Sequence, residues 1–308
     1  MKTRIALLAL LFPLSAFAQR VVVLGTAQDG GMPHTGCEHK ACVAARNDPK
    51  LARKVASLAV VSGNKAILVD ASPDLPAQIQ EVHTFRPFPE GRADRAPFDG
   101  VLLTHAHIGH YLGLAHFGFE SLSTKDLPVY ASPRMAEYLR TNGPWSQLVK
   151  LNNIKIQEIK LNEWFALTEG ITVKAFAVPH RDEYSDTVAF LIRGPKRTLL
   201  YVPDTDTWKT WTRPLPQVIE EEKVDYALLD ATFYSIDELP DRDLSKIKHP
   251  LVTDSMELLG PLVKAGKLKV FFTHLNHSNP ALYPDGKARK NIEANGFKVL
   301  EETDELEL

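Results

Sequence analysis

Three histidines that follow directly on a predicted strand restrict the possible folds of this chain more than any other feature. The apolar run FDGVLLT (98–104) is typical of a buried strand, and THAHIGHYLGL continues it with His105, His107 and His110. Side chains just beyond a strand can converge on one point. Imidazole is the commonest neutral ligand of zinc and also suits iron. The pattern therefore predicts a metal site at the end of a buried strand.

Short β-rich runs alternate with turns and helical patterns along most of the sequence. The patterns predict strands over 20–26, 57–72 (two strands around a Gly-Asn turn), 98–104, 187–204 (a hairpin turning at Gly194-Pro195), 224–233 and 267–274, and helices over 133–142, 255–266 and 287–296. Residues 83–100 are rich in Pro, Arg and Gly and predict a surface loop rather than a linker. Hairpins mixed with covering helices favour one layered α/β domain with mixed or antiparallel sheets.

The first eighteen residues, MKTRIALLALLFPLSAFA, have the pattern of an export signal. Lys2 and Arg4 precede an apolar stretch, and Ala16-Phe17-Ala18 fits cleavage after Ala18. This predicts a mature domain of residues 19–308 in the periplasm or outside the cell, with a buried N-terminal helix as the alternative. The apolar stretch falls short of the roughly 18 residues that a membrane-spanning helix needs, and no later stretch reaches that length.

The charge balance argues against electrostatic nucleic-acid binding. The chain has a net charge of -2, and removing Lys2 and Arg4 with no acidic residue lost makes it -4. We therefore expect no nucleic acid as a partner. No membrane partner is expected either, because no stretch is long enough to span a bilayer, and the expected substrate is a small molecule. The oligomeric state is left open, a homodimer included.

The histidine cluster resembles the His-x-His-x-Asp-His signature of the metallo-β-lactamase fold superfamily, and the likeness extends over nearly all of residues 19–308. It implies an αββα sandwich with a metal cleft at one edge of the sheets. It also implies two metal sites that share Asp204, the first from His105, His107, His180 and Asp204, and the second from His110, His274 and Asp204. Asp70, which ends ILVD, resembles the family's aspartate that supports the metal loop, or is a turn residue before Ser72-Pro73.

Gly109 stands where the signature has its aspartate. An aspartate there would ligate the second ion and orient the attacking water, so glycine predicts a weaker second site. The expected results are a single metal ion, a second ion completed by water or substrate, or chemistry other than ordinary hydrolysis.

Cys37, His39 and Cys42 form a second cluster, Cys-x-His-x-x-Cys, and they are three of the four ligands that structural zinc needs. The loop resembles that of phosphoribosyl cyclic phosphodiesterases, in which a histidine shortly after the last catalytic ligand completes a zinc site; here that histidine is His277. The resemblance implies a structural zinc. A disulfide between Cys37 and Cys42 is the alternative in an oxidising compartment.

The same family implies that Asp230 and His249 lie near the metal, with His249 as proton donor and Asp230 as its orienting partner; a surface or capping role for His249 is the alternative. A further likeness, to the pyrroloquinoline quinone biosynthesis B proteins, rests on VLGTAQDGGMPHTGC, ILVDASPDLPAQI and THLNHSNPAL. The export signal does not suit a cytoplasmic biosynthetic enzyme.

The expected function is metal-dependent hydrolysis of a small ester, lactone or phosphodiester, with one catalytic and one structural zinc. Iron or manganese are alternatives at the catalytic site. Two other functions stay open because a fold does not determine a reaction. One is an iron- and oxygen-dependent oxidase or hydroxylase, as the likeness to the quinone-cofactor proteins implies, and the other is a non-catalytic protein that binds a small molecule.

Overall fold

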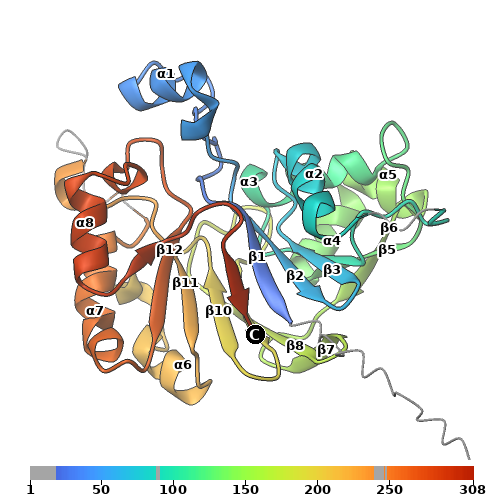
Figure 1. The fold of residues 1–308 in the computed structure, drawn as a ribbon. Helices are drawn as coiled ribbons and strands as arrows, with labels where there is room; N and C mark the ends of the chain where they lie inside the picture. Colours follow the sequence, from blue (N-terminus) through green and yellow to red (C-terminus); the bar gives the residue numbers. More distant parts are fainter. Residues whose placement is uncertain (1–18, 88–90, 239–245, 247) are drawn as a thin grey trace, which may run out of the picture.

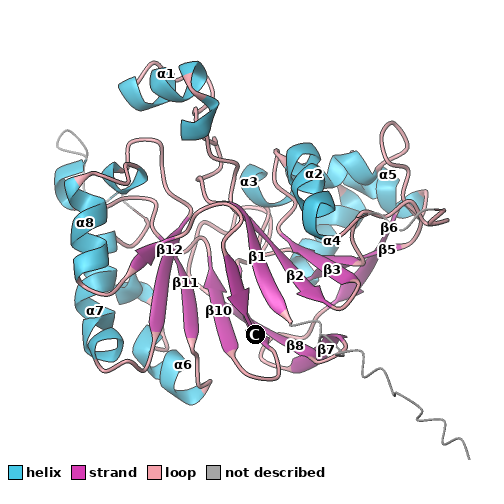
Figure 2. Ribbon diagram, in the orientation of Figure 1, coloured by secondary structure: helices cyan, strands magenta, loops and turns pink. Residues whose placement is uncertain are grey.

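Two sheets packed face to face form the centre of the molecule, and helices cover both outer faces (Figures 1 and 2). The computed structural model describes residues 19–87, 91–238, 246 and 248–308. The arrangement is an αββα sandwich, which confirms the predicted fold class. The predicted export signal, residues 1–18, lies outside the described residues.

The first sheet has seven strands in the order β14-β1-β2-β3-β4-β5-β6. Its strands are β1 (Arg20–Gly25), β2 (Ser57–Ser62), β3 (Lys65–Val69), β4 (Gly100–Leu102), β5 (Leu127–Ala131), β6 (Ile154–Glu158) and β14 (Glu305–Glu307). Strands β1 to β3 pair antiparallel, and β3 to β6 pair parallel.

The second sheet also has seven strands, in the order β13-β12-β11-β10-β9-β8-β7. Its strands are β7 (Trp164–Thr168), β8 (Ile171–Ala177), β9 (Val188–Arg193), β10 (Thr198–Val202), β11 (Tyr226–Asp230), β12 (Lys269–Thr273) and β13 (Lys298–Val299). Strands β7 to β10 pair antiparallel, and β10 to β13 pair parallel.

The helices divide between the two outer faces, apart from α1, which stands away from the sandwich (Figure 1). Helices α2, α4 and α5 lie on the side of the first sheet, and α6, α7 and α8 lie on the side of the second. The helices are α1 (Lys40–Asn47), α2 (Leu75–Phe85), α3 (Ile108–Tyr111), α4 (Pro133–Thr141), α5 (Trp145–Lys150), α6 (Leu215–Glu221), α7 (Val252–Lys264) and α8 (Lys287–Ala294).

Central strands are buried on both faces, which explains their unbroken apolar runs. In β1, Val21 and Val23 pack between the sheets, whereas Val22 and Leu24 pack under the helices. Three apolar cores result, one between the sheets and one under each helical layer. These cores make the sheets a rigid support for the loops at their edge.

Each predicted strand and helix is present, with small differences at the ends. Helix α7 begins at Val252 rather than Ser255, and the predicted loop 83–100 starts after α2 has reached Phe85. Strands β5 to β8 were not predicted. Their sequences leave several side chains partly exposed and carry weaker apolar patterns.

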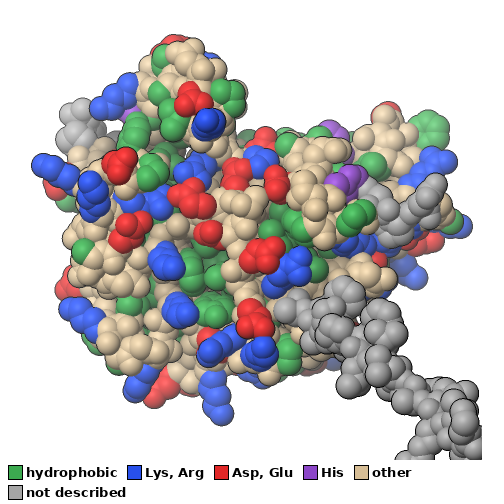
Figure 3. All heavy atoms as spheres, viewed as in Figure 1, with side chains coloured by type: hydrophobic (Ala, Val, Ile, Leu, Met, Phe, Trp, Pro, Cys, Tyr) green, Lys and Arg blue, Asp and Glu red, His purple; other side chains and the backbone are tan. Residues whose placement is uncertain are grey.

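The surface in Figure 3 has acidic and basic side chains interspersed over the face shown. Among the described residues, no helix has both the length and the apolar character to cross a membrane.

Candidate metal centre

The strand directions bring the predicted ligands to one edge of the sandwich. Two antiparallel pairings separate β1 from β3, so β1, β3 and β4 run the same way, and the same reasoning gives β8, β10, β11 and β12 a common direction. Their carboxyl ends therefore lie at a common edge in each sheet. The predicted residues come directly after these ends: Asp70 after β3, His105 and His107 after β4, His180 after β8, Asp204 after β10, Asp230 at the end of β11 and His274 after β12.

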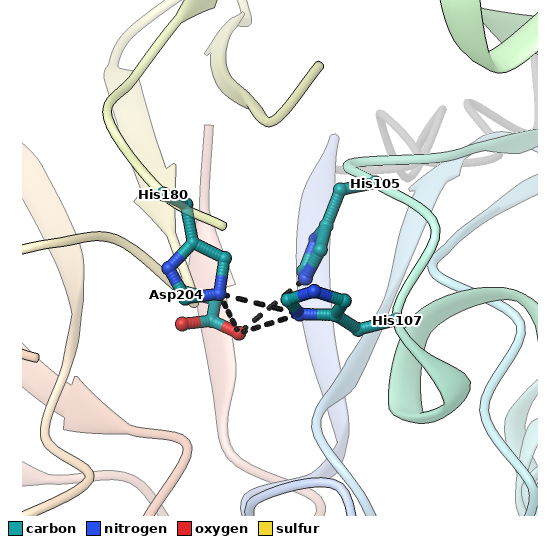
Figure 4. Close-up of side chains that lie close together, drawn as sticks. All are labelled: His105, His107, His180 and Asp204. Carbon is teal, nitrogen blue, oxygen red and sulfur yellow. Dashed lines mark hydrogen bonds and ion pairs between the residues drawn. The ribbon is translucent and has the colours of Figure 1, made fainter. Parts of the chain in front are cut away.

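The first predicted ligand set comes together around the carboxylate of Asp204 (Figure 4). His180 Nε2 lies 3.2 Å, His105 Nε2 3.4 Å and His107 Nδ1 3.8 Å from Asp204 Oδ2. One atom from each of the four residues lies within 4.8 Å of the others. The four residues follow strands of both sheets and are spread over about a hundred positions of sequence. Together they offer three nitrogens and one oxygen as metal ligands.

The second predicted set approaches the same oxygen, Asp204 Oδ2, at slightly longer distances. The Nε2 atoms of His110 and His274 are 4.0 and 3.9 Å from Asp204 Oδ2. Asp29, which was not predicted, completes this group: its Oδ1 lies 3.4 Å from His110 Nε2 and 3.8 Å from His274 Nε2. The available signal was its position, in a glycine-rich loop after a strand that ends at the same edge.

Buried polar atoms without hydrogen-bond partners test whether these residues fit a metal. Nearly every buried polar atom in a protein is paired. Five of the atoms that lack a hydrogen-bond partner among the described residues belong to this cluster, namely Asp29 Oδ1, His105 Nε2, His110 Nε2, Asp204 Oδ1 and His274 Nε2. In the two sets together, four histidines face the carboxylate of Asp204 through Nε2. Imidazole nitrogens combined with a carboxylate oxygen are ligands that suit zinc and iron. The residues therefore fit a metal centre.

The opposite ring nitrogen of each histidine is held by an outer hydrogen-bond partner. Such partners determine the tautomer and orientation of metal-binding imidazoles. His110 Nδ1 lies 2.7 Å from Asp70 Oδ2, and Asp70 also accepts hydrogen bonds from the backbone N–H and hydroxyl of Thr104. Asp70 thus supports the metal loop, as the family resemblance implied.

The other histidines have equivalent partners. The closest atoms are Asp206 Oδ1 for His180 Nδ1 (3.3 Å), Glu183 Oε2 for His107 Nε2 (3.0 Å), Thr104 Oγ1 for His105 Nδ1 (3.0 Å) and Thr232 Oγ1 for His274 Nδ1 (3.0 Å). None of these partners was predicted, because each lies outside the signature motif.

Burial and neighbouring charges set the protonation states in the cluster. Burial holds the pKa of His105 well below its usual value, and a neutral imidazole is the form that binds metal. Burial raises the pKa of Asp204, but His274, His249 and the other histidines outweigh it, so the net pKa is well below the usual range. Burial raises the pKa of Asp29, but the nearby His110 and His274 imidazoles outweigh burial, so its net pKa is well below the usual value. Both carboxylates are therefore ionised and able to bind a cation.

Asp230 and His249 lie beside Asp204, as predicted. His249 Nδ1 is 2.8 Å from Asp230 Oδ2 and 3.2 Å from Asp204 Oδ1. Asp230 is fully buried and accepts the backbone N–H groups of Thr205 and Thr232. Burial opposes protonation of His249, but the charges of Asp230 and Asp204 raise its pKa well above the usual value.

The cysteine cluster forms in part as predicted. Ligand atoms of Cys37, Cys42 and His277 lie within 4.8 Å of one another, and both cysteines are free. His39, the predicted third member of the loop, lies outside this group. Its Nδ1 accepts the N–H of Ala41 and caps α1, and its ring centroid is 6.1 Å from that of His277. The helix start thus uses one nitrogen of His39.

The sequence is similar to that of a known protein family and of several of its members. Residues 65–295 match the family model described as a β-lactamase superfamily domain. A coenzyme PQQ synthesis protein B from Methylorubrum extorquens (strain PA1) is 26% identical over 314 residues, which cover 94% of this chain and 99% of that protein. The protein of the same name from Rhodopseudomonas palustris is 27% identical over 315 residues, with the same coverage of 94% and 99%.

Two solved structures share the fold. Zinc-bound PqqB from Methylobacterium extorquens superposes with a TM-score of 0.78 at 24% identity, covering 94% of this chain and 100% of that one. A diphosphatase from the PhnP family superposes with a TM-score of 0.64 at 20% identity, covering 94% and 97%. The matches confirm the predicted resemblance to both branches.

Proposed function

Because the chain belongs to the β-lactamase superfamily, whose family model matches residues 65–295, we propose that it is a metal-dependent hydrolase of a small ester, lactone or phosphodiester. The observation that carries the proposal is the cluster of buried atoms around Asp204, namely Asp29 Oδ1 and the Nε2 atoms of His105, His110 and His274, which have no hydrogen-bond partner among the described residues. A cluster of this kind is costly to bury unless a cation pairs with it. The cluster lies at the strand ends that form the edge of the sandwich, and one of its members, Asp29, lines a cavity.

Zinc is the metal that we assign to the centre. His105, His107, His180 and Asp204 would hold one ion, and histidine nitrogens with a carboxylate oxygen are ligands that zinc prefers. A similar protein, PqqB from Methylobacterium extorquens, has a zinc-bound crystal structure. When bound, such an ion lowers the pKa of water and polarises a carbonyl or phosphoryl oxygen.

His249 is the proposed proton donor to the leaving group. Its Nδ1 is engaged by Asp230 and Asp204, so Nε2 is the nitrogen left to meet a substrate. The two carboxylates favour the charged imidazole, which would transfer its Nε2 proton to the leaving oxygen as the scissile bond breaks. Asp230 is a positioning residue in this scheme, because it holds the ring and does not touch the substrate.

A cavity beside the metal centre supports a small-molecule substrate. Its volume is about 790 Å³, within the usual range for such sites, and Asp29 lies in its wall. Met32, Ile108 and Leu112 contribute apolar surface, and Ile108 and Leu112 are exposed in it. The cavity thus offers an apolar wall for a substrate beside Asp29.

A structural zinc is the second proposed ion. Cys37, Cys42 and His277 supply three ligands near α1, and His277 Nδ1 is buried without a hydrogen-bond partner among the described residues. Three ligands leave one position of a tetrahedral zinc site to be filled. His39 is the nearby candidate, through the ring nitrogen that does not cap α1.

The test is the metal content of residues 19–308, purified without a metal-binding tag, together with hydrolysis of phosphodiester, lactone and ester substrates. We expect zinc and hydrolysis of at least one substrate class, with one zinc lost in a Cys37→Ser/Cys42→Ser variant. If iron is found at the histidine centre and the protein consumes oxygen, the proposed reaction becomes oxidation instead of hydrolysis. A protein that binds metal but turns over none of these substrates would contradict the hydrolase proposal.

A further inference from the structure

Gly109 is surrounded so closely that no side chain fits there. A Cβ atom built on it would lie 2.9 Å from the Cα and Cγ atoms of Asp29 and closer still to Asp29 Oδ1. Real Cβ atoms essentially never come within 3.0 Å of such neighbours. The space that an aspartate at 109 would fill is therefore occupied by the side chain of Asp29.

We propose that the histidine centre holds a second metal ion, and that Asp29 supplies this ion with the carboxylate that Gly109 lacks. The inference deepens the proposed function and rests on it. Asp29 Oδ1 lies 3.4 Å from His110 Nε2 and 3.8 Å from His274 Nε2, and these three atoms form one of the clusters able to hold an ion. Oδ1 is buried and has no hydrogen-bond partner among the described residues. Gly109 is then a requirement for the second site rather than a sign of its loss.

The loop that carries Asp29 is anchored beside the other ligands. Ala27 forms backbone bridges to Val55 and to Leu275, the residue after His274. Gln28 N–H donates to the carbonyl of Leu275 at 3.0 Å, and Gly31 N–H donates to the carbonyl of Gln28 at 2.7 Å. The first bond ties the loop to the backbone that follows β12, and the second closes a tight turn around Asp29. The carboxylate is thus positioned by backbone that also positions His274, as a metal ligand must be.

The two carboxylates of the site, Asp204 and Asp29, lie near different sets of histidines. Asp204 Oδ2 lies within 4.0 Å of histidines from both groups, whereas Asp29 Oδ1 contacts the second group, at 3.4 Å from His110 and 3.8 Å from His274. Removing Asp29 should therefore weaken one ion and leave the other, held by His105, His107 and His180, in place.

The experiment counts zinc ions in Asp29→Asn, which keeps the size of the side chain. Wild type, this variant and Asp74→Asn are dialysed against the same buffered free zinc and their metal content is measured. Asp74 is the matched control because it lines the same cavity but belongs to none of the ligand clusters. Zinc at the cysteines is subtracted with Cys37→Ser/Cys42→Ser.

We expect two ions at the histidine centre of wild type and of Asp74→Asn. Asp29→Asn should hold one, with the affinity for the second lowered by more than about tenfold. Equal zinc in Asp29→Asn and wild type would overturn the role of Asp29 and leave the metal-dependent function standing. A wild-type centre without zinc would instead overturn the proposed function.

A swap variant tests the equivalence of the two positions. Asp29→Gly/Gly109→Asp moves the carboxylate to the position it has in the signature, and removing the Asp29 side chain relieves its clash with residue 109. The backbone must still move apart, because the Cα of residue 29 lies 2.9 Å from a Cβ atom built at position 109. We expect the swap to regain the second ion. A folded swap variant that stays one ion short would contradict the proposal.

Discussion

Asp70→Asn isolates the effect of the hydrogen bonds behind the metal ligands. Asp70 is fully buried and adopts a positive φ of 63°, which asparagine tolerates, so the substitution keeps both shape and backbone. In the wild type, one carboxylate oxygen accepts the backbone N–H of Thr104 at 2.8 Å, and the other faces His110 Nδ1 at 2.7 Å. Each oxygen thus meets a donor.

An amide cannot satisfy both neighbours. If its NH₂ group faces Thr104 N–H, two buried donors oppose each other, which costs about 1–3 kcal/mol. If the NH₂ group faces His110, Nδ1 must become the acceptor and the proton moves to Nε2, the nitrogen that faces the second site. Either arrangement disturbs the centre, so zinc affinity should fall about 10- to 100-fold.

Two measurements check this prediction. Denaturant unfolding of metal-depleted protein should give a free energy of unfolding about 1–3 kcal/mol below that of the wild type. In saturating zinc, the difference should grow by about 1.4 kcal/mol for each tenfold loss of affinity. Asp99→Asn is the control, because Asp99 is a partly buried aspartate at the opposite end of β4 from His105. Asp70→Asn with wild-type zinc affinity would refute the reasoning.

Three other results are expected. Asp99→Asn should lower stability by about 1–3 kcal/mol at neutral pH without loss of zinc. Burial opposes ionisation of Asp99, but hydrogen bonds from Ala66 N–H and Lys65 and the charge of Arg86 outweigh it and lower the pKa. The stabilisation by ionised Asp99 is therefore complete above the unfolded pKa of about 3.9 and is lost as the pH falls through the folded pKa. A difference in stability between Asp99→Asn and wild type that persists in stronger acid would contradict this. His249→Ala should lower turnover about 100- to 10,000-fold with zinc content intact, and unchanged turnover would remove His249 from the mechanism. We also propose export: N-terminal sequencing of the protein from a periplasmic extract should begin at Gln19, and a chain that starts at Met1 would contradict the signal.

Local patterns were enough to predict the framework of the fold. The runs of β1, β10 and β12 are apolar on both faces, and turns such as Gly63-Asn64 separate the strands, so these elements could be recognised one at a time. The same holds for His105 and His107, which lie within three residues of each other just beyond a strand. The grouping of His180, Asp204 and His274 with them depended on the likeness to a known superfamily, since single residues at strand ends are weak signals.

Apart from Asp70, which the family resemblance implied, the outer partners of the histidines and the place of Asp29 were decided by the tertiary structure alone. Asp29 and Gly109 are eighty positions apart, and no local pattern shows that their atoms compete for one space. That competition arises because β1 and β4 run in the same direction in one sheet and because Ala27 pairs with the residue after His274. A sequence states which ligand types are available and at which strand ends. Distances of a few ångströms between those ends follow only from strand order and direction, and these distances determine whether glycine at 109 removes a metal site or makes room for a different carboxylate.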